Sequence, residues 1–163
     1  MNAIDTLRNT AATSAVVLTK YVEDLSDQDL MARPAPGCNH LAWQLGHLIS
    51  SECQLLDSVC PGAAPQLPEG FAEKHSKETG ADDDPGHFCS KQEYLDLFAK
   101  VQAATSAALD GMTEADFDKP SPEAFQSMFP TVGHLFVLIT MHPMMHAGQF
   151  VPVRRTLGKP VVI

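Results

Sequence analysis

The stretch TVGHLFVLITMHPMMHAGQFVPVRR, from Thr131 to Arg155, is the most informative segment of this chain. It is a long apolar run that carries His142 and His146 four residues apart. In an α-helix, residues i and i+4 lie about 40° apart on one face and one turn apart along the axis. The spacing therefore predicts that both imidazoles point the same way, as in helices that bind a divalent metal through a His-x-x-x-His pair.

Length, composition and charge indicate one soluble domain. A chain of 163 residues with 44% hydrophobic residues suits a single core, so we expect one domain over residues 1–163. The net charge of −9 disfavours nucleic-acid binding, because it repels a phosphate backbone. The N-terminus has no secretory signal pattern, and Gly133, Pro143 and three histidines make the apolar run a buried helix and not a membrane span. We therefore expect a cytoplasmic protein whose four cysteines are reduced thiols, with neither a membrane nor a nucleic acid as partner.

Helical periodicity recurs in three further segments. Apolar residues follow one another every three or four positions over 4–25, 39–60 and 90–109, as they do in the last helix over 131–157. Asn39 is the expected N-cap of the second segment, and Ser90-Lys-Gln-Glu93 has the form of a capping box before the third. Four long helices with no alternating strand pattern predict an all-α four-helix bundle.

Residues 61–89 set the expected order of the helices. This segment holds four prolines, four glycines and the acidic run Asp82-Asp83-Asp84, and it shows no sustained periodicity. We interpret it as a long surface connection. About thirty residues can cross the whole length of a bundle, because a helix of about 20 residues is only ~30 Å long. The second and third long helices are then parallel, which predicts an up-down-down-up bundle with a long crossover between them.

The third metal ligand is expected on the second helix. His134 is twelve residues from His146, about 18 Å along the same axis, so the two cannot share an ion. His47 lies near the middle of its helix, at the height of His142 and His146, whereas His40 lies about 10 Å away near the helix start. We interpret His40, His134 and the loop residues His75 and His87 as ordinary core histidines. A hydrogen-bonded core cluster remains the alternative for the trio His47, His142 and His146.

Two motifs resemble a known family. Trp43-Gln-Leu-Gly-His47-Leu, after the lead-in Leu25 to Gly37, is similar to the second-helix signature of the DinB superfamily. His142-Pro-Met-Met-His146-Ala-Gly-Gln149, followed by Arg154-Arg155-Thr-Leu-Gly158, resembles its fourth-helix signature. The resemblance implies an up-down-down-up bundle, often a homodimer, with a divalent metal (zinc or nickel, or else iron) held by three residues. These residues fall on His47, His142 and His146.

Pro143 lies between two of these candidate ligands. A proline inside a helix frees a carbonyl and disfavours helical geometry at the residue before it, here His142. Two outcomes are open: the helix kinks at this point, or it breaks and separates the pair.

The predicted site favours an enzyme with an open metal position. Three neutral imidazoles leave room for water or substrate, and no carboxylate stands between His142 and His146 as it does in H-E-x-x-H proteases. The family's characterised branches imply transferases and isomerases that use a low-molecular-weight thiol such as bacillithiol or mycothiol. The leading hypothesis is a metal-dependent thiol S-transferase, or a related hydrolase or isomerase, acting on a small molecule.

Other roles in this hypothesis stay open. No general base is assigned, and Ser51 and Gln149 are candidates for contacts to the ligands because they are close in sequence. An apolar pocket beside the metal is a further hypothesis, lined by Met141, Met144, Met145 and Phe150, although a methionine-rich helix face more often belongs to a core. The alternative function is a non-catalytic bundle that uses the metal for stability or its faces for dimerisation.

Overall fold

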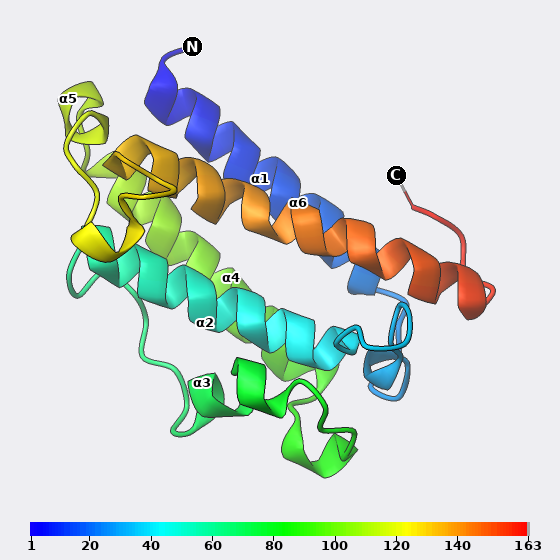
Figure 1. The fold of residues 1–163 in the computed structure, drawn as a ribbon. Coiled ribbons are helices and arrows are strands. Elements are labelled where there is room, and N and C mark those ends of the chain that lie inside the picture. The colour runs from blue at the N-terminus through cyan, green and yellow to red at the C-terminus, as the bar shows by residue number, and fades with distance from the viewer. Residues whose placement is uncertain (163) are drawn as a thin grey trace.

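Four long helices form the frame of the protein in a computed structural model, in which residues 1–162 are described (Figure 1). They are α1 (Ala3–Val22), α2 (Leu41–Val59), α4 (Lys91–Asp110) and α6 (Val132–Thr156). The short helices are α3 (Phe71–Lys74) and α5 (Glu114–Phe117), with 3-10 turns η1 (Asp29–Met31), η2 (Lys77–Thr79), η3 (Pro85–His87) and η4 (Glu123–Phe125). Residues 1–162 contain no β-strand, and Pro120 and Thr131 form an isolated bridge. The predicted all-α four-helix bundle is confirmed.

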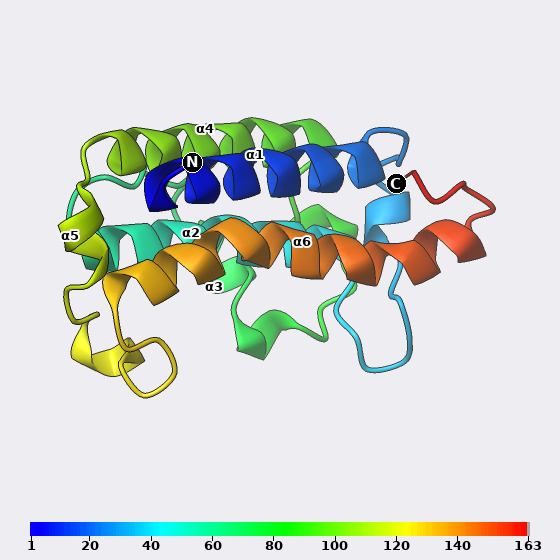
Figure 2. The same ribbon diagram turned by 90° about the horizontal axis from the view of Figure 1, so that it is seen from above.

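The long helices run in two parallel pairs (Figures 1 and 2). Near the end of α6, Arg154 donates a hydrogen bond to the carbonyl of Tyr21 near the end of α1, so these helices share a direction. In the other pair, Thr105 of α4 donates to Glu52 of α2. The segment from Cys60 to Ser90 crosses the length of the bundle between α2 and α4, so α2 and α4 both run opposite to α1 and α6 (Figure 1).

The helix starts follow the local sequence with one correction. Ser90 and Glu93 form the predicted capping box at α4. At α2, however, the N-cap is His40 and not Asn39, because the His40 Nδ1 accepts the backbone N–H of Trp43 at 3.0 Å. His40 can do so because it is fully buried and its other ring nitrogen lies 3.0 Å from the Asp82 carbonyl. A short polar side chain is the usual N-cap, but an unprotonated imidazole nitrogen can also accept a hydrogen bond from a backbone N–H.

The crossing segment is more than a surface connection. Phe71 and His75 are buried, and the His75 ring hydrogen-bonds to the Phe71 carbonyl and to the Tyr94 hydroxyl, each at 2.7 Å. This packing requires Gly46 of α2, since a Cβ there would lie 2.1 Å from the His75 ring. The interpretation of this segment as a surface connection was therefore incomplete, although His75 is the core histidine that was expected. A single glycine allows the segment to rest directly on α2, next to His47.

Helix α6 passes through both of its prolines. It is one continuous α-helix from Val132 to Thr156, with Pro143 and Pro152 inside it. A break at Pro143, one of the two outcomes left open by the sequence, does not occur, so His142 and His146 stay on one helix. Among residues 1–162, no helix combines the length and the apolar character needed to cross a membrane.

Candidate metal centre

Three histidines from two helices converge at one place. The ring nitrogens of His47 on α2 and of His142 and His146 on α6 include one atom from each residue within 4.8 Å of the others. The Nε2 atoms of His142 and His146 are 3.2 Å apart. The His47 ring centroid lies 5.4 Å from that of His142 and 5.6 Å from that of His146. Within residues 1–162 this is the one cluster of three or more His, Cys, Asp or Glu side chains with such geometry.

Burial keeps these imidazoles neutral at physiological pH. Burial first, and the neighbouring histidines second, lower the pKa of His146 to about 3 and that of His142 to about 4. Burial also lowers the pKa of His47, and the positive charge of Lys77 adds to this effect. Neutral imidazoles offer a lone pair, which is the form that binds a metal.

Gln44 fixes the orientation of one ring. Its Oε1 lies 2.9 Å from the Nδ1 of His146, and its amide nitrogen donates to the Asn39 carbonyl at 2.8 Å. Because a carboxamide oxygen can only accept, the His146 proton is on Nδ1 and the lone pair is on Nε2. That lone pair therefore points into the cluster. Gln44 is itself 1% exposed, so the contact lies in the dry interior.

Trp43 covers the His47 ring. The two rings stack with centroids 4.9 Å apart and an interplanar angle of 9°. The indole N–H donates to the Ser76 carbonyl at 3.0 Å and lies 3.2 Å from the Thr79 hydroxyl. The crossing segment thus holds Trp43, and Trp43 limits the rotation of His47.

Sequence reasoning assigned no role to Gln44 or Trp43. Both belong to the motif that carried the family resemblance, and they precede His47 by three and four residues, so they share its side of α2. Their partners lie on other segments, and that information is absent from local spacing. The signal that could have found Gln44 is the general need of a ligating imidazole for a hydrogen bond at its other nitrogen.

The donor set fits a divalent transition metal. Ligands at about 2.0–2.1 Å from a tetrahedral ion lie about 3.3 Å from one another, close to the 3.2 Å between the two Nε2 atoms on α6. Three neutral nitrogen donors, one with its proton fixed on the far side of the ring, suit zinc, nickel or iron.

The remaining histidines lie outside the cluster. His40 and His75 are buried and hydrogen-bonded, as expected for core residues. His134 and His87 are exposed, so their interpretation as core residues was wrong. His134 pairs with Thr131 at the start of α6, and His87 pairs with Asp82 in the crossing segment. For His134, periodicity alone does not separate a core position at a helix end from a solvated one, and His87 lies in a segment without periodicity.

Ser51 and Gln149, the two candidates for contacts to the ligands, lie in different surroundings. The Ser51 hydroxyl lies 3.5 Å from both ring nitrogens of His47, at the edge of hydrogen-bond distance. Gln149 is exposed on α6 and forms no hydrogen bond with a clustered histidine among the described residues. It follows His146 by three residues, but its side chain is exposed.

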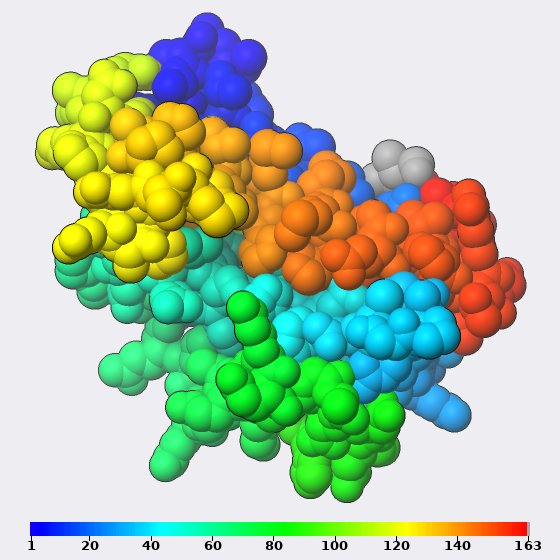
Figure 3. Space-filling view, in the orientation of Figure 1, coloured from blue at the N-terminus to red at the C-terminus, as the bar shows by residue number. Residues whose placement is uncertain are grey.

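An apolar groove adjoins the cluster along α6. Its volume is about 560 Å³. We call it the Met groove; it is lined by Met128, Phe129, His134, Val137, Leu138, Met141, His142, Met144 and Met145. Met141, Met144 and Met145 line this groove and are not core residues, which was the less favoured of the two interpretations of the methionine-rich face, whereas Phe150 is buried in the core and takes no part. The front surface formed by α6 and the preceding loop is visible in Figure 3.

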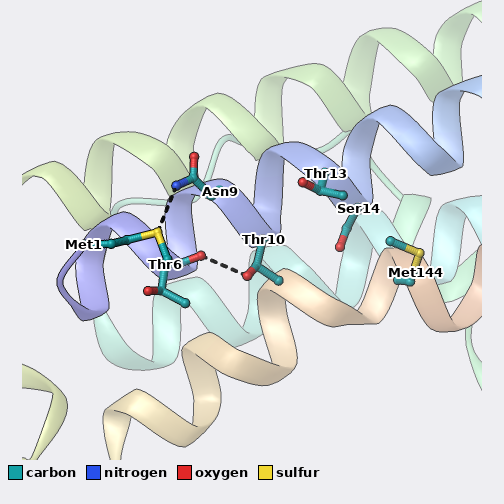
Figure 4. Close-up of a pocket in the computed structure, with 7 residues that line it drawn as sticks. All are labelled: Met1, Thr6, Asn9, Thr10, Thr13, Ser14 and Met144. Atoms are coloured by element: carbon teal, nitrogen blue, oxygen red, sulfur yellow. Dashed lines mark hydrogen bonds between the residues drawn. The ribbon is translucent and has the colours of Figure 1, made fainter.

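A second hollow lies on the other side of Met144, between α1 and α6 (Figure 4). It measures about 280 Å³ and is lined mainly by hydroxyl and amide side chains of α1, among them Thr6, Asn9, Thr10 and Thr13. None of the three clustered histidines lines it. The Met groove is therefore the hollow that borders the candidate metal centre.

Two solved structures resemble this fold. A conserved protein from Enterococcus faecalis superposes with a TM-score of 0.73 at 18% identity, covering 98% of this chain and 99% of the other. YfiT from Bacillus subtilis, described as a probable metal-dependent hydrolase with an unusual four-helix bundle topology, superposes with a TM-score of 0.64 at 18% identity. That alignment covers 96% of this chain and 89% of YfiT. At this level of identity, both show a shared fold.

The sequence itself gives the family. A search of curated proteins found no match. A sequence model of the DinB superfamily matches residues 12–150, which include all three clustered histidines and most of the bundle. The chain therefore belongs to the DinB superfamily.

Proposed function

We propose that this protein is a metal-dependent enzyme in which His47, His142 and His146 hold one divalent ion that activates a thiol or water. The leading reaction is S-transfer from a low-molecular-weight thiol to a small electrophile, with a related hydrolysis or isomerisation as the nearest variants. Zinc and nickel are the leading metals, and iron is the third candidate.

The convergence of three neutral imidazoles within 4.8 Å is the observation that carries this proposal. The description of YfiT as a probable metal-dependent hydrolase agrees with it. The family resemblance of the sequence motifs adds the thiol. Three protein ligands are the number found in catalytic zinc sites, whereas structural sites use four.

The chain's own residues prepare the site for such chemistry. A divalent ion held by three histidines would lower the pKa of a bound thiol or water and so supply a nucleophile at neutral pH. Gln44 keeps the lone pair of His146 directed at the cluster. Trp43 excludes water from one face of His47. The Met groove gives access for an electrophile at His142.

Thiol consumption tests the reaction. Protein loaded with zinc or with nickel is incubated with an aryl or alkyl halide in the presence of bacillithiol, mycothiol or no added thiol. The proposal expects thiol loss and product formation with at least one metal, and neither with the His47→Ala variant. If no metal form consumes thiol, S-transfer is wrong. Hydrolysis of esters or amides by the same metal forms would then identify water as the nucleophile.

The alternative is a non-catalytic bundle with a histidine core. The 3.2 Å distance between the Nε2 atoms of His142 and His146 favours it, because one ring could donate to the other without any metal. In that case, or with a metal used only for stability, no electrophile or ester is turned over. A large fall in melting temperature on chelation, without any activity, would identify the metal as structural.

Location and assembly are part of the same proposal. All four cysteines are free thiols, which favours a reducing compartment such as the cytoplasm. The homodimer in the proposal comes from the family resemblance of the sequence motifs. Analytical ultracentrifugation over a range of protein concentrations tests the dimer.

A further inference from the structure

The Met groove contains large apolar side chains that are exposed. Met128, which precedes α6, is 75% exposed, and Met145 and Met141 of α6 are 57% and 52% exposed, whereas Phe136 and Phe150 of the same helix are completely buried. Phe129 and Leu138, which line the same groove, are partly buried and pack against the core. A hollow with an exposed apolar lining is typical of a binding site.

His142 joins this groove to the metal centre. It lines the groove, and its Nε2 also faces that of His146 in the cluster. Around the axis of α6, Met145 lies about 60° from His142 on one side, and His146 lies about 40° from it on the other. A group bound in the groove is therefore next to the candidate ligand, at the border of the reacting centre.

The chemistry of the lining restricts the ligand. The lining residues include no Asp, Glu, Lys or Arg, and the polar side chains among them are those of His134 and His142. The protein as a whole carries a net charge of −9, so an apolar stretch of this size is a local departure from the surface around it. Methionine side chains adapt to rings of different shape and make favourable sulfur contacts with aromatic edges. A volume of about 560 Å³ is in the range of small-molecule sites.

We propose that the Met groove binds an uncharged aromatic or branched aliphatic group of the substrate and places the adjoining reactive carbon beside His142. The reaction at this carbon rests on the proposed function, whereas binding of the apolar group in the groove does not depend on it. It names the substrate class as small neutral electrophiles with a bulky apolar end.

Methionine methyl NMR tests the groove without requiring turnover. Protein labelled with ¹³C at the methionine methyl groups is titrated with N-benzylacetamide, an unreactive aromatic probe, and separately with N-methylacetamide. The methyl signals of Met128, Met141 and Met145 should shift and saturate with the benzyl compound alone, while those of Met31 and Met112 stay in place.

Variants decide whether the groove causes these shifts. Changing both Met141 and Met145 to Gln removes apolar contact at nearly constant length, and it should weaken N-benzylacetamide binding by about tenfold. Val16→Thr changes an equally exposed apolar residue outside the groove and should leave the affinity unchanged. Unchanged affinity in the double variant, or no shift in the wild type, would overturn the inference.

Two further arms separate the possible outcomes. N-benzylacetamide binding should persist in His47→Ala. A wild-type protein that binds this probe but binds neither metal nor thiol would contradict the proposed function and leave the groove inference standing. A second copy of the chain is the competing occupant. If the methionine signals move with protein concentration alone, and the double variant converts a dimer to a monomer, the groove is a dimer interface and the inference is wrong.

Discussion

Gln44 of α2 accepts a hydrogen bond from the Nδ1 of His146 on α6 at 2.9 Å, across the seam that carries the histidine cluster. The contact joins two residues that are 102 positions apart in sequence, and it assigns the tautomer of one candidate ligand. Because Gln44 orients His146, the geometry of the cluster depends on a residue outside the three histidines.

Removing this acceptor should weaken metal binding. Gln44→Leu keeps the approximate size but frees the His146 ring to present N–H to the cluster, so we expect zinc affinity to fall by about 10–100-fold. Gln44→Glu keeps an acceptor and should retain affinity closer to that of the wild type. Gln149→Leu, an exposed glutamine on α6, is the matched control. Competition with a chromophoric chelator measures all four proteins, and equal affinities would contradict the role of Gln44.

The close approach of His75 to Gly46 predicts opposite effects for two glycine replacements. In Gly46→Ala the new Cβ would lie 2.1 Å from the His75 ring, so the crossing segment must move and stability should fall by about 1–3 kcal/mol. In Gly148→Ala nothing lies within 4 Å of the added Cβ, and the higher helix propensity of alanine should raise stability by about 0.5–1 kcal/mol. Urea unfolding of the metal-free proteins compares them. A stable Gly46→Ala protein would show that the segment does not rest on α2.

Glu52 should make stability depend on pH. Burial raises its pKa from 4.5 to about 7, although Thr105 and Gln102 donate hydrogen bonds to its carboxyl group. The folded-state pKa of Glu52 is above its unfolded value. The contribution of this carboxyl group to the free energy of unfolding is therefore fully present below pH 4.5 and is lost as the pH rises to about 7. The total loss is about 3 kcal/mol.

Comparison with Glu52→Gln isolates this contribution. Other titrating groups cancel in the difference between the two proteins, so the unfolding free energy of the wild type relative to the variant should fall between pH 4.5 and 7 and then stay level. Denaturant unfolding at several pH values measures it. A difference that does not change with pH would mean that the carboxyl group titrates normally.

The end of the bundle depends on a buried arginine. Arg154 is fully buried, donates to the carbonyls of Tyr21 and Pro160, and pairs with Asp24 at 2.5 Å. Arg154→Ala takes the Arg154 donor from the buried carbonyl of Tyr21 and removes packing, so we expect a loss of about 2–4 kcal/mol. Arg155→Ala, at the exposed neighbouring position, should change stability by less than about 0.5 kcal/mol. Similar melting temperatures for the two variants would contradict this account.

The sequence was sufficient for features that depend on local spacing. Apolar periodicity predicted the four long helices, and the capping box at Ser90 fixed the start of α4 to the residue. Helix rise per residue placed His47 level with His142 and His146, and the structure brings the three together. Their role as metal ligands stays a prediction.

Features that depend on contacts between distant segments could not be predicted. The burial of His75 against Gly46 and the partners of Gln44 and Trp43 follow from how the crossing segment and α6 meet α2. The sequence also predicted the wrong N-cap for α2, because asparagine is a commoner N-cap than histidine. His40 caps the helix in its place, and its burial depends on contacts with distant segments.

Metal stoichiometry tests the central claim most directly. Elemental analysis of protein purified without added metal, and of the same protein after zinc loading and gel filtration, should give about one divalent ion per chain. His47→Ala, His142→Ala and His146→Ala should each lose it, while His134→Ala, which alters a histidine outside the cluster, should retain it. A folded wild-type protein without metal after loading, or a full metal content in the His47 and His146 variants, would contradict the account.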